Sequence, residues 1–162
     1  MHMHSKENLL LNPDFIDILS AFSEEKVEYL VVGGYAMAFH GFVRATGDID
    51  LWIRVEEENA GKVRRALQSF GAPLGDLTIE DLLTPGMVYQ MGVVPNRIDV
   101  INDITGVDFD EAWAHRTSIE FHALTIPLIG KEQLLQNKKA TGRAKDLGDV
   151  IRLEEGSEND PF

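Results

Sequence analysis

The 162-residue sequence contains no cysteine, which excludes disulfide bonds, thiolate nucleophiles and cysteine-ligated zinc sites. It also has no apolar run near the roughly 20 residues that a membrane-spanning helix needs. The longest strongly apolar stretch, residues 123–129, is interrupted by Pro127. Because the N-terminus also lacks the basic-then-apolar layout of a secretory signal, we expect a cytoplasmic protein without a membrane partner.

Positive charge is scarce. The chain has 15 Lys and Arg against 27 Asp and Glu, a net charge of −12. A surface this negative repels phosphate backbones, so a nonspecific nucleic-acid binder is not expected. The basic residues gather in one segment, 131–145, which has five of them and a single acid. That segment is the part of the chain best suited to receive a small anion.

Apolar periodicity and turn residues predict a mixture of helices and strands. With 44% hydrophobic residues, the chain can bury one core. We therefore predict a single α+β domain over residues 1–155, with a mixed β-sheet flanked by helices, and a flexible tail over 156–162. The expected helices are 12–25, 35–40, 60–70, 78–83, 108–113, 131–140 and 143–154, and the expected strands are 27–32, 48–55, 87–94, 97–102 and a pair within 117–129.

One segment, residues 29–53, carries most of the chemical information. In it a strand runs into Gly33-Gly34, a short helix follows, and the next strand begins Asp48-Ile49-Asp50. Residues two apart on a strand share a face, so the carboxylates of Asp48 and Asp50 are expected about 5–6 Å apart. Their repulsion, roughly 3 kcal/mol at an effective dielectric of about 20, calls for a cation or a shared proton. Mg²⁺ with oxygen ligands suits such a pair.

A later strand repeats this pattern around Asp99, with Ile98 and Val100 facing the other way. If it lies beside the strand at 48–55, Asp99 completes a group of three carboxylates, which can hold two metal ions for phosphoryl or nucleotidyl transfer. Gly33 and Gly34 lie at a strand-to-helix turn. Without side chains there, backbone amides can approach phosphate oxygens closely.

These motifs resemble the DNA polymerase β-type nucleotidyltransferase superfamily. The match comprises Gly33-Gly34, thirteen intervening residues, Asp48-Ile49-Asp50 and the later strand with Asp99. The chain looks most like small prokaryotic members, namely antibiotic nucleotidyltransferases and the transferase-type partners of toxin–antitoxin systems. The resemblance implies the polymerase β-like fold and assigns the three aspartates as catalytic ligands of two Mg²⁺ ions, with Asp99 the candidate base. It places the triphosphate of an NTP substrate at Gly33 and Gly34.

Four more residues are candidate nucleotide contacts. Arg44 and Thr46 lie in the loop just before Asp48, where they can contact phosphate or nucleotide, or satisfy local backbone groups. Lys138 and Lys145 are the better candidates for phosphate contact in the basic segment. A solvated helix face is the alternative for both lysines.

The resulting prediction is a Mg²⁺-dependent nucleotidyltransferase that moves a nucleoside monophosphate from an NTP to a hydroxyl acceptor and releases pyrophosphate. The acceptor is a small molecule or a protein; tRNA suits the acidic surface less well. A core this small also predicts a homodimer that completes the cleft. The alternative is a non-catalytic or weakly active binding module of the same fold, such as a toxin–antitoxin component.

Overall fold

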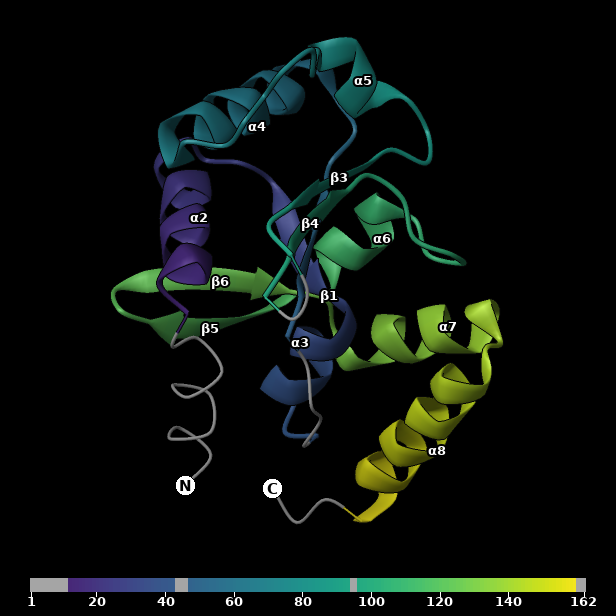
Figure 1. Ribbon diagram of the computed structural model, residues 1–162. Coiled ribbons are helices and arrows are strands. Elements are labelled where there is room, and N and C mark those ends of the chain that lie inside the picture. Colours follow the sequence, from purple (N-terminus) through teal and green to yellow (C-terminus); the bar gives the residue numbers. More distant parts are fainter. Residues whose placement is uncertain (1–11, 43–46, 94–95, 160–162) are drawn as a thin grey trace.

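The computed structural model describes residues 12–42, 47–93 and 96–159, which form seven helices and a six-stranded sheet (Figure 1). The strand order is β3-β4-β2-β1-β6-β5. The pairs β2·β4 and β1·β6 are parallel and the other three are antiparallel, so the predicted mixed sheet of an α+β protein is confirmed. The strands are β1 (Tyr29–Val32), β2 (Ile49–Ile53), β3 (Val88–Met91), β4 (Ile98–Ile101), β5 (Thr117–Phe121) and β6 (Leu124–Leu128).

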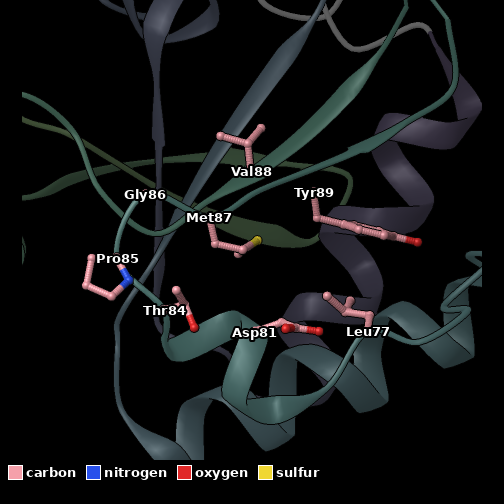
Figure 2. Close-up of a pocket in the computed structure, with 8 residues that line it drawn as sticks. All are labelled: Leu77, Asp81, Thr84, Pro85, Gly86, Met87, Val88 and Tyr89. Carbon is pink, nitrogen blue, oxygen red and sulfur yellow. The ribbon is translucent and has the colours of Figure 1, made fainter.

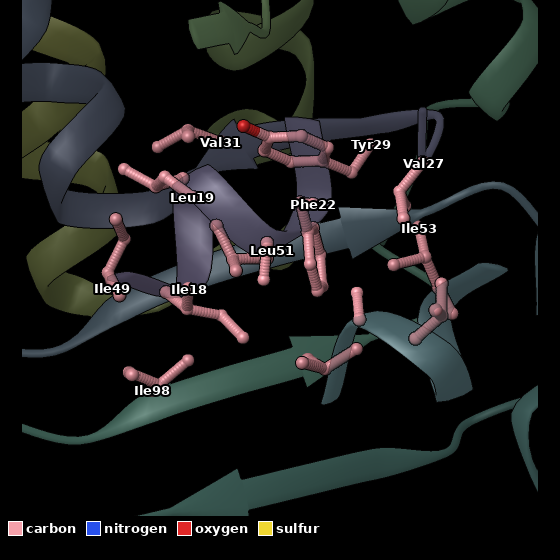
Figure 3. Packing of buried hydrophobic residues seen from close by; sticks show 14 of the residues in the cluster. Ile18, Leu19, Phe22, Val27, Tyr29, Val31, Ile49, Leu51, Ile53 and Ile98 are labelled. Atoms are coloured by element: carbon pink, nitrogen blue, oxygen red, sulfur yellow. The ribbon is translucent and has the colours of Figure 1, made fainter. Parts of the chain in front are cut away.

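Three helices cover one face of the sheet: α2 (Pro13–Glu24), α4 (Glu57–Phe70) and α5 (Ile79–Leu83). The first of them begins at Pro13, one residue after the expected start at 12, and the Asn12 side chain caps it by accepting a hydrogen bond from the backbone N–H of Asp14. Its apolar stripe packs on alternate residues of the central strands, as Figure 3 shows for Ile18 and Phe22 near Leu51. This larger core fixes the positions of β2 and β4, which carry the acidic motifs.

The other face carries α3 (Gly33–Phe39), α6 (Phe109–Ala114), α7 (Lys131–Thr141) and α8 (Ala144–Asn159), which contribute to a second core. Trp52 lies in this core, 2% exposed, with its ring 5.0 Å from that of Phe109 in an edge-to-face contact. Figure 1 shows α7 leading away from the sheet and α8 turning back from its far end.

Several predicted boundaries were wrong by a few residues; α4, for example, begins at Glu57 rather than at residue 60. Two more concern the glycine turn and the C-terminal tail. The short helix α3 begins at Gly33 rather than at residue 35, because Val32 is still extended and Gly33, at φ +70°, turns the chain directly into the helix. At the other end of the chain, α8 continues to Asn159 instead of ending near 154, so it includes residues 156–159 of the expected tail. Gly156 lies against the Phe42 ring, where a Cβ atom would be 2.7 Å from the ring carbons.

None of the helices in the described ranges combines the length and the apolar composition that a membrane span requires.

Candidate functional site

The sheet brings the acidic motifs together at one end. β2 runs parallel to β4, and in this pairing Asp50 is the register partner of Asp99. The two side chains therefore point to the same face of the sheet. Neighbouring strands lie about 4.8 Å apart, which puts the two carboxylates side by side. The prediction that the Asp99 strand lies beside the Asp48–Asp50 strand is thus confirmed. We call Asp48, Asp50 and Asp99 the carboxylate cluster.

Gly33, at the end of the neighbouring strand β1, lies directly beside Asp50 of this cluster. It directly follows Val32, the register partner of Asp50 on β1. A Cβ atom at position 33 would lie only 2.3 Å from Oδ2 of Asp50, and the residue has a φ of +70°. A side chain here would be strained and would displace the carboxylate, so glycine is required for two independent reasons.

Arg97 supplies the positive charge within the cluster. Its guanidinium donates to both oxygens of Asp99, with Nε 2.8 Å from Oδ1 and Nη2 3.1 Å from Oδ2. The same Nη2 is 3.4 Å from Oδ2 of Asp48, and the Arg97 backbone N–H donates to Oδ1 of Asp48 at 2.9 Å. One arginine therefore holds two of the three carboxylates, and its fork makes the strong bidentate type of contact with Asp99.

Asp50 is the carboxylate with the most unfavourable surroundings for a negative charge. Burial, the neighbouring charge of Asp99, a hydrogen bond shared with Asp99 and the charge of Asp48 raise its pKa from 3.8 to about 7, while Arg97 acts in the opposite direction. A shared proton of this kind is one of the two arrangements that two adjacent carboxylates require. The other arrangement is a second cation bound between the carboxylates.

The donor chemistry of the cluster suits a hard divalent cation, because three carboxylates offer only oxygen ligands. Gly33 also leaves the space beside Asp50 free of a side chain. As the side chains lie, however, residues 12–42, 47–93 and 96–159 contain no group of three or more His, Asp or Glu arranged to hold a metal ion. In this arrangement, Asp99 and Asp48 are turned toward the Arg97 guanidinium.

Lys138 lies in surroundings that do not fit its predicted phosphate contact. Its side chain is 6% exposed, and its ammonium lies 3.3 Å from Asp146 and 3.2 Å from Asp149, both on α8. Arg143 and Thr141 also donate to Asp146. The lysine is therefore a buried bridge between α7 and α8.

The other candidate nucleotide contacts are placed as follows. Lys145 is exposed at the beginning of α8, and its phosphate contact stays a prediction. Gly34 follows Gly33 in the first turn of α3, beside the carboxylate cluster. Arg44 and Thr46 lie outside the described residues.

A separate pocket of about 330 Å³ lies between α5 and the edge strand β3 (Figure 2). Its polar groups already have partners within the protein: Asp81 closes the capping box of α5 with Thr78, and the Tyr89 hydroxyl donates to the carbonyl of Pro73. Register places Gln90 beside Asp99, so Tyr89 faces away from the carboxylate cluster. We therefore favour the cluster, not this pocket, as the functional site.

Two residues of the site, Arg97 and Gln90, were not predicted from the sequence. Arg97 precedes Asp99 by two positions, and this spacing on a strand puts both on one face, so the signal was present in the sequence. Gln90 is exposed and is the register partner of Asp99 on β3. Its position depends on the pairing of the β3–β4 hairpin, which the sequence alone does not fix.

No family model matches the sequence, and no curated protein matches it. Solved structures do resemble it. A putative nucleotidyltransferase from Thermotoga maritima aligns with a TM-score of 0.59 and 17% identity, covering 90% of this chain and 96% of its own. An antigenic nucleotidyltransferase-like protein from Paracoccidioides brasiliensis aligns with a TM-score of 0.52 and 16% identity, covering 86% of this chain and 74% of its own. The carboxylate cluster thus lies on a chain that has the nucleotidyltransferase fold.

Proposed function

We propose that this chain is a Mg²⁺-dependent nucleotidyltransferase that moves a nucleoside monophosphate from an NTP to a hydroxyl acceptor. The acceptor oxygen forms a bond to the α-phosphorus, the bond from that phosphorus to the β-bridging oxygen breaks, and pyrophosphate leaves. The observation that carries the proposal is the register of Asp50 with Asp99 directly beside Gly33. Two carboxylates next to a glycine at a strand-to-helix turn form a place for a triphosphate and its cation.

Each residue has a role in this proposal. Asp48, Asp50 and Asp99 would hold Mg²⁺, which when bound supplies the charge neutralisation that phosphoryl chemistry needs. Gly33 and Gly34 leave the backbone open to phosphate oxygens, and Asp99 is the candidate acceptor of the hydroxyl proton. The apolar residues that alternate with the acids hold β2 and β4 in place, since Ile49, Leu51 and Val100 are fully buried. The positions of the carboxylates are thus preorganised by the core.

The charge of the chain supports a class of acceptor. A net charge of −12 opposes long contacts with a nucleic-acid backbone and favours the approach of a cationic small molecule. We therefore propose a small cationic hydroxyl compound as the acceptor, ahead of a partner protein and of tRNA.

A second candidate function rests on a specific observation. Arg97 already neutralises part of the cluster, and the described residues hold no ready group of three metal ligands. Such a site can persist in a binding module that no longer transfers nucleotides, for example in a toxin–antitoxin component. This alternative predicts that nucleotide and metal do not bind at the cluster.

Thermal unfolding separates the two candidates. Wild-type protein is heated with each NTP, in Mg²⁺ or in EDTA, beside the variant Asp48→Ala/Asp50→Ala. A ligand at about 100 times its dissociation constant adds roughly 2.7 kcal/mol, or about 5–10 °C for a chain of this size. The transferase proposal predicts a Mg²⁺-dependent rise with at least one NTP, and its loss in the double variant.

The matched control is Asp76→Ala, which removes an exposed loop carboxylate away from the cluster. It should retain the full nucleotide-dependent rise. If no NTP shifts the wild-type transition, and the double variant is more stable than the wild type, the carboxylates bind no nucleotide and the binding-module function is favoured.

A further inference from the structure

Arg97 has two kinds of contact with the carboxylate cluster, and they come from different parts of the residue. Its backbone N–H holds Asp48 at 2.9 Å, a bond that any residue except proline can make. Its side chain makes the bidentate contact with Asp99 and the longer contact with Asp48. The position of Asp48 is thus partly independent of the guanidinium, while the neutralisation of Asp99 depends on it.

A divalent cation needs the same oxygens that the guanidinium uses. Oδ1 and Oδ2 of Asp99 each accept one N–H from Arg97, and the Asp99 side chain is only 9% exposed. Asp50 shares its hydrogen bond with this same carboxylate. Each Asp99 oxygen keeps a second lone pair, but a cation bound there would lie next to the guanidinium charge, so we expect an incoming cation to separate Arg97 from Asp99.

We propose that the Arg97 guanidinium competes with a divalent cation for the carboxylate cluster, so that a free cation binds only when the guanidinium leaves Asp99. The inference rests on the proposed function, because it takes the cluster as the cation site. It adds a regulatory residue: Arg97 keeps the site closed to free metal and holds Asp48 and Asp99 in place without it. The apparent affinity for a cation alone is reduced by the fraction of molecules in which Arg97 is away from Asp99.

The experiment measures the binding of Mn²⁺ alone, by calorimetry and by the EPR signal of the free ion, to wild type and Arg97→Gln. Glutamine keeps the backbone bond to Asp48 and removes the guanidinium. If the open arrangement makes up about a tenth of the wild-type molecules, Arg97→Gln binds Mn²⁺ about tenfold more tightly. Arg97→Lys keeps the charge without the bidentate fork, and it should fall between the two. It also keeps the test possible if the glutamine variant does not fold.

Two controls exclude other causes of tighter binding. Arg65→Gln removes an arginine that pairs with Glu25 at 2.9 Å on the opposite face of the sheet, so it matches the change in net charge. Adding Asp50→Asn to Arg97→Gln should remove the gain in affinity. A gain that survives in that double variant belongs to another site and overturns the inference.

The inference is also overturned if neither position-97 variant binds Mn²⁺ more tightly than Arg65→Gln does. A purely structural role for Arg97 predicts this result, with a lower unfolding temperature and unchanged affinity. These outcomes are independent of the nucleotide experiment. Nucleotide binding with no effect of Arg97→Gln rejects the inference alone, whereas tighter Mn²⁺ binding without any nucleotide binding rejects the transferase function alone.

Discussion

Two clusters of aspartates in the described part of the chain have a basic residue among them, and they differ in how completely their charges are paired. In the α7–α8 cluster, Lys138 lies between Asp146 and Asp149, and all three residues are at most 5% exposed. In the carboxylate cluster, Arg97 contacts Asp99 and Asp48, and among residues 12–42, 47–93 and 96–159 no ion pair reaches Asp50. Within the described residues, the first cluster has a cation between its two aspartates, whereas the second has one cation for three carboxylates, at one end of the sheet beside Gly33.

The two clusters also shift aspartate pKa values in opposite directions. Although burial acts to raise it, the pKa of Asp146 is lowered from 3.8 to about 2 by hydrogen bonds from Thr141, Arg143 and Lys138. The pKa of Asp50 is raised to about 7, chiefly by burial and by Asp99. Strongly perturbed groups without a full set of partners are typical of functional sites, and satisfied ones are typical of structural sites. The comparison therefore supports a structural role for the α7–α8 cluster and the functional role that we propose for the carboxylate cluster.

The largest expected effect comes from breaking the paired cluster. Lys138→Met leaves two buried carboxylates without their shared cation, and we expect a loss of about 3–5 kcal/mol in the free energy of unfolding. Chemical denaturation measures it. The matched control is the neighbouring Lys139→Met, because Lys139 pairs with Glu154 on the surface, where both side chains are at least half exposed. The control should lose less than about 1 kcal/mol. Equal losses in the two variants would contradict the structural role of Lys138.

The next substitution, Asp50→Asn, is expected to raise the free energy of unfolding, by an amount that depends on pH. Asp50 keeps its proton in the folded protein up to about pH 7 but loses it near 3.8 when unfolded, so its contribution to stability falls as the pH rises between these values. Asp50→Asn has no such dependence. In EDTA, we expect the variant to gain about 3 kcal/mol over the wild type between pH 4 and pH 7, with only a small further change above pH 7.

Asp146→Asn is the comparison for this pH series. Because the folded pKa of Asp146 is lowered to about 2, its contribution is present above pH 4 and is lost as the pH falls toward 2. The two variants should therefore diverge from the wild type in separate pH windows. Denaturation curves from pH 2 to pH 8 measure both. A stability difference for Asp50→Asn that does not change with pH would contradict its raised pKa.

Gly33→Ala tests the close approach to Asp50. The positive φ alone costs about 1–2 kcal/mol for a residue with a side chain. Gly71→Ala is the control, since Gly71 has a φ of +93° and a Cβ atom at that position would meet nothing within 4 Å. We expect both variants to lose stability, and only Gly33→Ala to lose nucleotide-dependent stabilisation. Unimpaired nucleotide binding in Gly33→Ala would contradict the placement of the triphosphate.

The smallest effect concerns Lys145. As an exposed residue it should change stability by less than about 0.5 kcal/mol when replaced by glutamine. If it contacts phosphate, Lys145→Gln lowers the nucleotide-dependent rise in unfolding temperature, while Lys62→Gln on α4 does not. Identical behaviour of the two variants would remove Lys145 from the site.

The sequence predicted the residues of the carboxylate cluster better than their partners. The alternation of apolar and acidic residues within β2 and within β4 is a local pattern that the sequence shows. Once the two strands were taken as neighbours, this pattern predicted that Asp50 and Asp99 share a face. The early start of α3 depends on a positive φ at Gly33, which the spacing of apolar residues does not reveal.

The role of Lys138 could not be predicted in the same way. Its partners lie eight and eleven positions along the chain, on a different helix, and they meet it only because α7 and α8 fold back on each other. Because Lys138 belongs to a segment rich in positive charge, the sequence predicted that it contacts an anion. Tertiary packing turned it into a buried bridge, which a charge pattern cannot show.

The most direct test of the central claim is a crystal structure with Mn²⁺ and a non-hydrolysable NTP analogue, in which anomalous scattering locates the metal. We predict a Mn²⁺ peak bound by oxygens of Asp50 and Asp99, with the triphosphate beside Gly33 and the Arg97 guanidinium displaced from Asp99. A metal bound elsewhere, or an Arg97–Asp99 contact that persists with the nucleotide in place, would contradict it.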